Sequence, residues 1–147
     1  MKFTCTVHID LPLEKVITLW LNQENNKHWQ DGFLSRDLIE GDYEQLGSKY
    51  KIILEQAGKR MELIETLLVN NLPDERKSLV EHKHMDNFQI IRFKEVSPNK
   101  TQYISEIEYI SIKHWIPRLM AKLFPKVFKN QVQKWSNQFK EFAENLI

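Results

Sequence analysis

At 147 residues, with 41% apolar and 28% charged side chains, the chain has the size and composition of one domain with its own hydrophobic core. A formal net charge of +1 gives the molecule no overall attraction for nucleic acid, and a single cysteine excludes an internal disulfide. No apolar run approaches the roughly 20 residues of a membrane span, and the first ten residues lack the apolar segment of a secretory signal. We therefore expect one cytoplasmic domain over residues 1–147, with no metal, no cofactor, no nucleic-acid partner and no stable membrane insertion.

The first ten residues alternate apolar and polar side chains, which is the pattern of a half-buried strand. The alternation predicts a strand over residues 2–10 and places Cys5 on its apolar face, as a small core residue rather than a nucleophile. Pro12 follows, and because proline fits the first position of a helix, a short helix is expected to begin there. A second helical turn is expected over residues 27–30.

From residue 33 to residue 112, segments rich in β-branched and aromatic residues alternate with short turn segments. This pattern predicts six strands, over residues 33–42, 48–56, 60–69, 76–84, 88–96 and 101–111. The turns include residues 57–59, 86–87 and 97–99. Because short connections join antiparallel neighbours, we expect a meander, with the N-terminal strand added at an edge or closing position.

The last third of the chain carries large apolar side chains at steps of three or four residues, the spacing of one helix face. The stripe consists of Ile116, Met120, Leu123, Val127, Gln131, Trp135, Phe139, Phe142 and Leu146, and it is widened by Leu119, Phe124, Phe128 and Val132. We expect one long helix that packs this face on the sheet. Pro125 should bend or break it near residues 122–124, which would make residues 114–124 a separate amphipathic segment.

Residues 113–147 hold seven Lys or Arg against two Glu, so the outer face of this helix is basic. A basic face of this kind is either simply solvated or meets an anionic membrane or partner. The sequence favours the solvated face and leaves the second alternative open.

Several short motifs follow one another along the chain. They are Ile9-Asp10-Leu11-Pro12-Leu13-Glu14-Lys15-Val16, Trp29, Gly47, Glu65, Asn71-Leu72-Pro73 and Phe139-Lys140-Glu141-Phe142-Ala143-Glu144. With the order of predicted elements, they make the chain resemble the SRPBCC superfamily, which includes START lipid-transfer domains, birch-pollen-allergen-like proteins and polyketide cyclase/dehydrase-like proteins. The resemblance covers essentially the whole chain. It implies an α+β helix-grip fold with a seven-stranded curved antiparallel sheet, two short helices and one long C-terminal helix.

The resemblance also implies a cavity between the concave sheet and the long helix that holds a hydrophobic or amphipathic small molecule. Strand alternation and the helix stripe select fourteen candidates for its wall. They are Trp29, Phe33, Tyr50, Ile52, Leu54, Met61, Leu63, Phe93, Tyr103, Ile107, Tyr109, Trp115, Leu119 and Leu123. The alternative is a closed core in which the same side chains fill the space.

Two side chains are weak candidates for catalysis, Glu65 and His82. A carboxylate that points inward from a strand would be desolvated, which raises its pKa toward a value useful for a general base. His82 and His84 lie two apart on a predicted strand and would face the same side, so they are a possible metal or acid–base pair. A solvated His-x-His on the sheet is the favoured interpretation, because the sequence fixes no further ligand.

These observations favour a non-catalytic binding module for a hydrophobic small molecule, as a monomer or weak homodimer. One alternative is a polyketide cyclase-like enzyme that uses Glu65 or His82 to abstract a proton. Another is an interaction or peripheral membrane-contact protein that uses the basic C-terminal helix. The superfamily shares no catalytic residues, so the resemblance does not choose among these functions.

Overall fold

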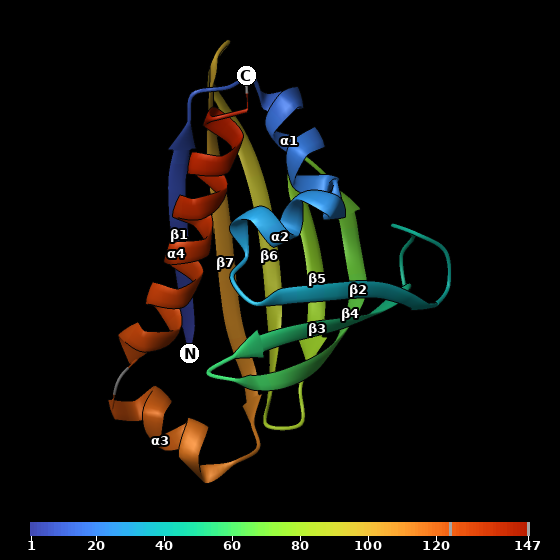
Figure 1. The fold of residues 1–147 in the computed structure, drawn as a ribbon, viewed down its shortest axis with the longest axis vertical. Coiled ribbons are helices and arrows are strands. Elements are labelled where there is room, and N and C mark those ends of the chain that lie inside the picture. Colours follow the sequence, from blue (N-terminus) through green and yellow to red (C-terminus); the bar gives the residue numbers. More distant parts are fainter. Residues whose placement is uncertain (124, 147) are drawn as a thin grey trace.

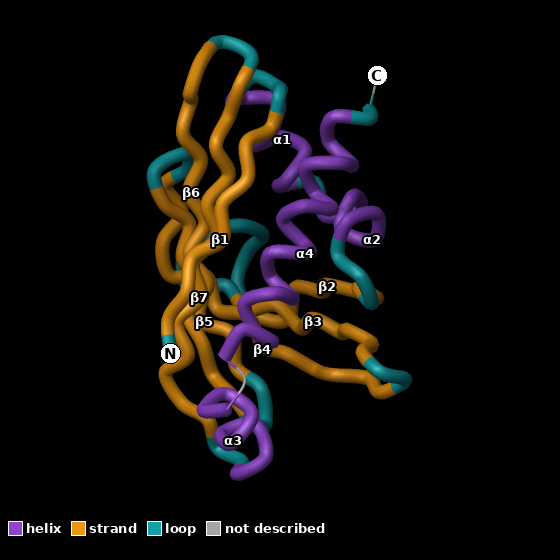
Figure 2. Tube along the Cα trace, turned by 90° about the vertical axis from the view of Figure 1, so that its left-hand side faces the viewer, coloured by secondary structure: helices purple, strands orange, loops and turns teal. Residues whose placement is uncertain are grey.

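The computed structural model describes residues 1–123 and 125–146 and shows a curved antiparallel sheet with helices on its concave face (Figures 1 and 2). The strands are β1 (Lys2–Ile9), β2 (Phe33–Glu40), β3 (Lys49–Gln56), β4 (Lys59–Asn71), β5 (Glu75–Glu81), β6 (Met85–Ser97) and β7 (Lys100–Ile112). The helices are α1 (Leu13–Leu21), the 3-10 turn η1 (Gln23–Asn25), α2 (Asn26–Trp29), α3 (Trp115–Leu123) and α4 (Pro125–Glu144). The predicted α+β architecture is confirmed.

The seven strands follow the order β1-β7-β6-β5-β4-β3-β2, and every neighbouring pair is antiparallel. Hairpins join β2 through β7 in sequence, and β1 is added at the edge beside β7, as the pattern predicts. The β3–β4 hairpin turns on Ala57 and Gly58, whose φ angles of 52° and 74° are both positive. Two positive φ angles are typical of the turn whose twist matches antiparallel strands.

Burial alternates along the strands because one face of the sheet meets the helices and the other meets solvent. On β1 the buried residues are Cys5, Val7 and Ile9. The sheet curls, so that β2, β3 and β4 cross the direction of β1, β6 and β7 (Figure 1). This curl gives the sheet its concave face.

The turn between β5 and β6 corrects the predicted boundaries. His82 and His84 lie in the turn itself rather than on a strand, and Asp86 and Asn87 belong to β6. The His82 N–H donates a hydrogen bond to the Met85 carbonyl at 3.0 Å and closes the turn. β5 therefore ends, and β6 begins, three residues earlier than predicted.

The hydrophobic core lies where α1, α2 and the C-terminal half of α4 meet β1, β6 and β7. Phe139 of α4 is fully buried, and its ring contacts the rings of Trp29 and Tyr103 edge-on, with centroids 5.4 Å away in both cases. Val16 and Ala143, both completely buried, pack in the same cluster. A single aromatic side chain therefore joins α2 and α4 to the central sheet.

The C-terminal region forms two helices, α3 and the long α4, so the predicted break that separates residues 114–124 from the main helix is confirmed. The separation falls where Pro125 was expected to produce a bend, although Phe124, a predicted member of the stripe, lies outside the described residues. α3 lies at the opposite end of the molecule from the C-terminus, beside the end of β7 (Figure 1).

The apolar stripe is buried only in the second half of α4. Its earlier members Ile116, Met120, Leu123 and Val127 are exposed, as is Leu146 at the end of the stripe. Helical spacing identified an apolar face correctly, but only the part of that face that lies over the sheet and the two short helices is covered. None of the helices among the described residues is long and apolar enough to cross a membrane.

Replacing Phe139 by alanine should lower the free energy of unfolding by about 3–5 kcal/mol, because the cavity left would lie between three packed elements. The free energy of unfolding of a typical domain is only about 5–15 kcal/mol, so the variant should lose a large part of its stability. Urea unfolding followed by tryptophan fluorescence measures the loss. Lys126→Ala, on the exposed side of the same helix, is the control and should change stability by less than about 1 kcal/mol. Equal stability of the two variants would show that α4 does not hold the core together.

Candidate ligand-binding site

A cavity of about 390 Å³ lies between the concave face of the sheet and α4. Side chains from α1, α2, β2 to β7 and α4 line it, so almost every element of the fold contributes to the wall. This volume falls within the range of small-molecule sites in proteins.

Nine of the fourteen predicted wall residues line this cavity. They are Trp29, Phe33, Ile52, Leu54, Met61, Leu63, Tyr103, Ile107 and Tyr109. On the neighbouring strands β3 and β4, Ile52 stands opposite Leu63 and Leu54 opposite Met61. Strand alternation places these cross-strand pairs on one inward face, which makes a continuous apolar wall. That they contact a ligand remains a prediction.

Five predicted wall residues lie elsewhere. Tyr50 is completely buried and is covered by the guanidinium of Arg36, which lies 3.6 Å above its ring. Phe93 belongs to the core, where its ring stacks on Tyr103 with centroids 5.2 Å apart. The other three lie on α3 and are exposed to solvent. They are Trp115, Leu119 and Leu123, which are 68%, 46% and 57% exposed.

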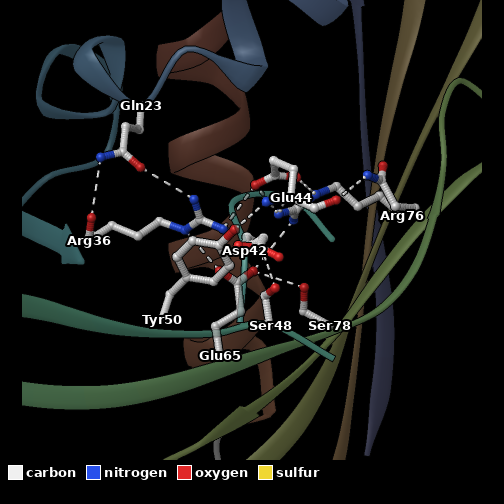
Figure 3. A network of polar contacts seen from close by, with 10 residues as sticks. Gln23, Arg36, Asp42, Glu44, Ser48, Tyr50, Glu65, Arg76 and Ser78 are labelled. Atoms are coloured by element: carbon white, nitrogen blue, oxygen red, sulfur yellow. Dashed lines mark hydrogen bonds and ion pairs between the residues drawn. The ribbon is translucent and has the colours of Figure 1, made fainter. Parts of the chain in front are cut away.

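The wall becomes charged at one end. Along β4 the inward side chains that line the cavity are Met61, Leu63 and then Glu65, so the apolar surface gives way to a carboxylate. Arg36 of β2 donates to Glu65 Oε1 through Nε at 2.9 Å (Figure 3). Glu65 Oε2 accepts a hydrogen bond from Ser78 Oγ at 2.8 Å and pairs with Arg76 Nη1 at 3.4 Å. The Glu65 carboxylate therefore balances part of the positive charge of both arginines.

The pKa of Glu65 lies below its usual value. Burial alone would raise it, but the positive charges of Arg76 and Arg36 and the hydrogen bonds from Ser78 and Arg36 outweigh burial. The expectation that an inward glutamate would have a raised pKa is thus wrong for Glu65. Because its carboxylate is held ionised and already accepts several hydrogen bonds, it is a weak proton acceptor.

A second carboxylate reaches the same arginines from the loop between β2 and β3. Glu44 accepts from Arg76 Nε at 3.2 Å and Nη2 at 3.1 Å, and from Arg36 Nη2 at 3.2 Å (Figure 3). Its backbone is also held, since its N–H donates to Tyr50 Oη at 2.5 Å and its carbonyl accepts from Asn70 Nδ2 at 2.9 Å.

His82 lies on the cavity wall, in the turn at the end of β5. Partial burial lowers its pKa, and the neighbouring positive charges of His84 and Lys83 lower it further, so the imidazole is neutral near pH 7. The rings of His82 and His84 lie 5.3 Å apart, and the His84 ring lies 4.9 Å from His114. Within residues 1–123 and 125–146, no group of three or more His, Cys, Asp or Glu has the arrangement of a metal site.

Polar groups also occur within the apolar part of the wall. The indole N–H groups of Trp29 and Trp135 are buried without a hydrogen-bond acceptor among the described residues. Gln131, the polar position in the helix stripe, lines the cavity as well.

Sequence reasoning found Glu65 but missed the other members of its polar network, which define its chemistry. These are Arg36, Glu44, Arg76 and Ser78. One signal was present: on β5 the residues Arg76, Ser78 and Val80 share a strand face, and all three are buried. A charged residue at an inward position of a strand indicates a buried partner.

Comparison with known proteins supports the fold. No protein-family model and no curated protein matches the chain by sequence. A START superfamily protein from Mycobacterium smegmatis is similar in structure, with a TM-score of 0.81, 14% identity and 99% of each chain covered. The Zhui aromatase/cyclase from Streptomyces sp. R1128 has a TM-score of 0.78 and 10% identity, covering 98% of this chain and 93% of that one.

Norcoclaurine synthase from Thalictrum flavum, solved with dopamine and hydroxybenzaldehyde, has a TM-score of 0.71 at 11% identity. The match covers 100% of this chain and 88% of that one. Identities this low establish the fold alone. The chain has the helix-grip fold, which this START superfamily protein and this aromatase/cyclase share, as the resemblance noted from the sequence implied.

Replacing Glu65 by glutamine should lower the free energy of unfolding at pH 7 by about 3–5 kcal/mol, because two buried arginines lose a shared counter-charge. Since the pKa of Glu65 is depressed in the folded state, its contribution is complete above the ordinary value of 4.5 and is lost as the pH falls through the lowered folded pKa. The difference between wild type and variant should therefore narrow below about pH 4.5.

Urea unfolding at a series of pH values measures this difference. Glu62→Gln is the matched control, because Glu62 lies on the same strand but is exposed and pairs with Lys51 at the surface. It should cost less than about 1 kcal/mol. A difference between wild type and Glu65→Gln that stays constant down to pH 3 would contradict the assigned ionisation.

Proposed function

We propose that this protein binds a small amphipathic molecule in the cavity between the sheet and α4, as a cytoplasmic monomer or weak dimer and without catalysing a reaction on it. The observation that carries the proposal is the cavity itself, with a volume of about 390 Å³, apolar side walls and one charged end. Apolar surface of this kind favours a ligand with a largely apolar body. The charged end favours a polar group at one end of that body.

The enzymatic alternative has less support from the geometry. A general base needs a free lone pair and a pKa near the working pH, whereas Glu65 is ionised and saturated by Arg36, Arg76 and Ser78. His82 is a neutral imidazole on the wall and is the better-placed candidate for proton transfer. Because the fold occurs in both a START protein and a cyclase, only the residues of the site can distinguish binding from catalysis.

Filling the cavity tests the binding proposal. Val132→Trp, on the cavity side of α4, should reduce the affinity for a fluorescent apolar probe by about tenfold or more, since the larger side chain would occupy the ligand volume. Asn130→Trp places the same indole on the exposed side of α4 and should leave binding unchanged. Fluorescence titration measures both variants, and circular dichroism confirms folding. Absence of probe binding to the wild type, or equal binding to both variants, would contradict the proposal.

A second candidate function is peripheral contact with an anionic membrane through α3. The observation that favours it is a group of exposed large apolar side chains on α3 and the start of α4, which we call the α3 patch. The patch consists of Trp115, Ile116, Leu119, Met120, Leu123 and Val127. The exposed basic residues Arg118, Lys122 and Lys126 lie among them. Apolar residues with interspersed positive charge are typical of helices that lie in the interface of an anionic bilayer.

Trp115→Ser combined with Leu119→Ser should reduce sedimentation with phosphatidylserine-containing vesicles by about tenfold, because two large side chains no longer enter the interface. Binding of the wild type should weaken with added salt. Leu68→Ser with Val96→Ser, two exposed apolar residues on β4 and β6, is the matched control. If the wild type does not sediment with these vesicles, or if both double variants sediment like it, the α3 patch is not a membrane contact.

A further inference from the structure

We infer that Arg36 and Arg76 form a carboxylate-binding site at the charged end of the cavity, and that Glu44 is an exchangeable internal occupant of this site. An amphipathic ligand with a carboxylate head group would displace Glu44 and take its place between the two arginines. This inference rests on the proposed function, because the apolar body of such a ligand lies in the cavity described above.

The two carboxylates in the network are not equivalent. Glu65 lies on β4 within the sheet, its side chain is 4% exposed, and Ser78 holds it in addition to both arginines. Glu44 lies on the loop between β2 and β3, its side chain is 19% exposed, and its carboxylate accepts hydrogen bonds from Arg36 and Arg76. Glu65 is therefore a fixed part of the wall, whereas Glu44 is the carboxylate that can leave.

The loop that carries Glu44 is strained at Glu44 itself and is held in place by a few polar contacts. Glu44 has a left-handed backbone with a φ angle of 57°, which is unfavourable for a residue with a side chain and is maintained only by surrounding contacts. Leu46 is exposed and Tyr43 is half-exposed against the edge of Tyr50, so polar contacts account for most of what holds the loop, chiefly the bonds of the Glu44 N–H and carbonyl to Tyr50 and Asn70. Once its carboxylate is displaced, Glu44 can reach water, where its charge is solvated.

The balance of charge between the two arginines and the two glutamates favours a ligand with a single negative charge on its head group. Arg36 and Arg76 carry two positive charges, which Glu65 and Glu44 balance at near neutrality. One carboxylate on the ligand restores this balance when Glu44 leaves, and the planar guanidinium groups offer paired donors that suit it. A neutral head group that displaced Glu44 would leave a buried positive charge uncompensated. The site should thus distinguish a carboxylic acid from the corresponding alcohol.

Calorimetric titration with lauric acid and lauryl alcohol tests the inference. The acid should bind the wild type more tightly than the alcohol. Glu44→Gln removes the competing negative charge and should raise the affinity for the acid by about tenfold. The affinity for the alcohol should change by less than about twofold. Glu40→Gln, at an exposed glutamate near the end of β2, is the control and should change neither affinity.

Hydrogen exchange of the wild type gives a second readout that needs no variant. Saturation with the acid should speed amide exchange in residues 42–48, because the Glu44 N–H would lose its bond to Tyr50, whereas saturation with the alcohol should leave this loop unchanged.

Equal affinity for acid and alcohol in both the wild type and Glu44→Gln, or an unchanged loop on binding of the acid, would overturn the inference while the proposed binding function stands. If neither compound nor an apolar probe binds the wild type, the proposed function fails and the inference fails with it.

Discussion

Burial of Arg36 and Arg76 against the carboxylates of Glu65 and Glu44 is the constraint on which the curled half of the sheet depends. Arg36 comes from β2, Glu65 from β4 and Arg76 from β5, so the network joins strands that are not all neighbours in the sheet. Taking these charges out of water is costly, and only complete pairing and hydrogen bonding offset the cost. The strands are therefore held where all partners meet, and this position also fixes the charged end of the cavity.

Dense apolar packing occurs in a different part of the molecule from the buried charges. Phe139 and its aromatic neighbours fill the space between α2, α4 and the central strands, which supplies the stability of a close-packed core. Towards the cavity the buried positions include small side chains, Ser105 on β7 and Ser136 on α4. Because the packed core and the cavity occupy different parts of the same sheet-to-helix interface, the fold can remain stable while part of its interior stays open to a ligand.

The same separation explains why the fold alone does not define the chemistry. Structures with the helix-grip architecture include a START protein and an aromatase/cyclase, and both share the sheet and the long helix with this chain. What distinguishes a site is the set of polar groups that the walls carry and their ionisation. Here the buried glutamate is stabilised as an anion, which suits electrostatic recognition of a ligand better than proton transfer.

The amino-acid sequence by itself determined the number and order of the strands, most of the tight turns, the short helices and a break near Pro125, because these depend on side-chain periods and backbone preferences within a few residues. It misplaced the turn between β5 and β6. It also placed most of the cavity wall, since alternation along a strand selects one face. Only the tertiary structure decided the ionisation of Glu65, whose partners Arg36 and Arg76 lie 29 and 11 residues away in the chain. The tertiary structure also decided that the apolar stripe is covered in the second half of α4 and exposed on α3 and at the start of α4, because burial depends on which elements pack against each part of the helix and not on the helical period.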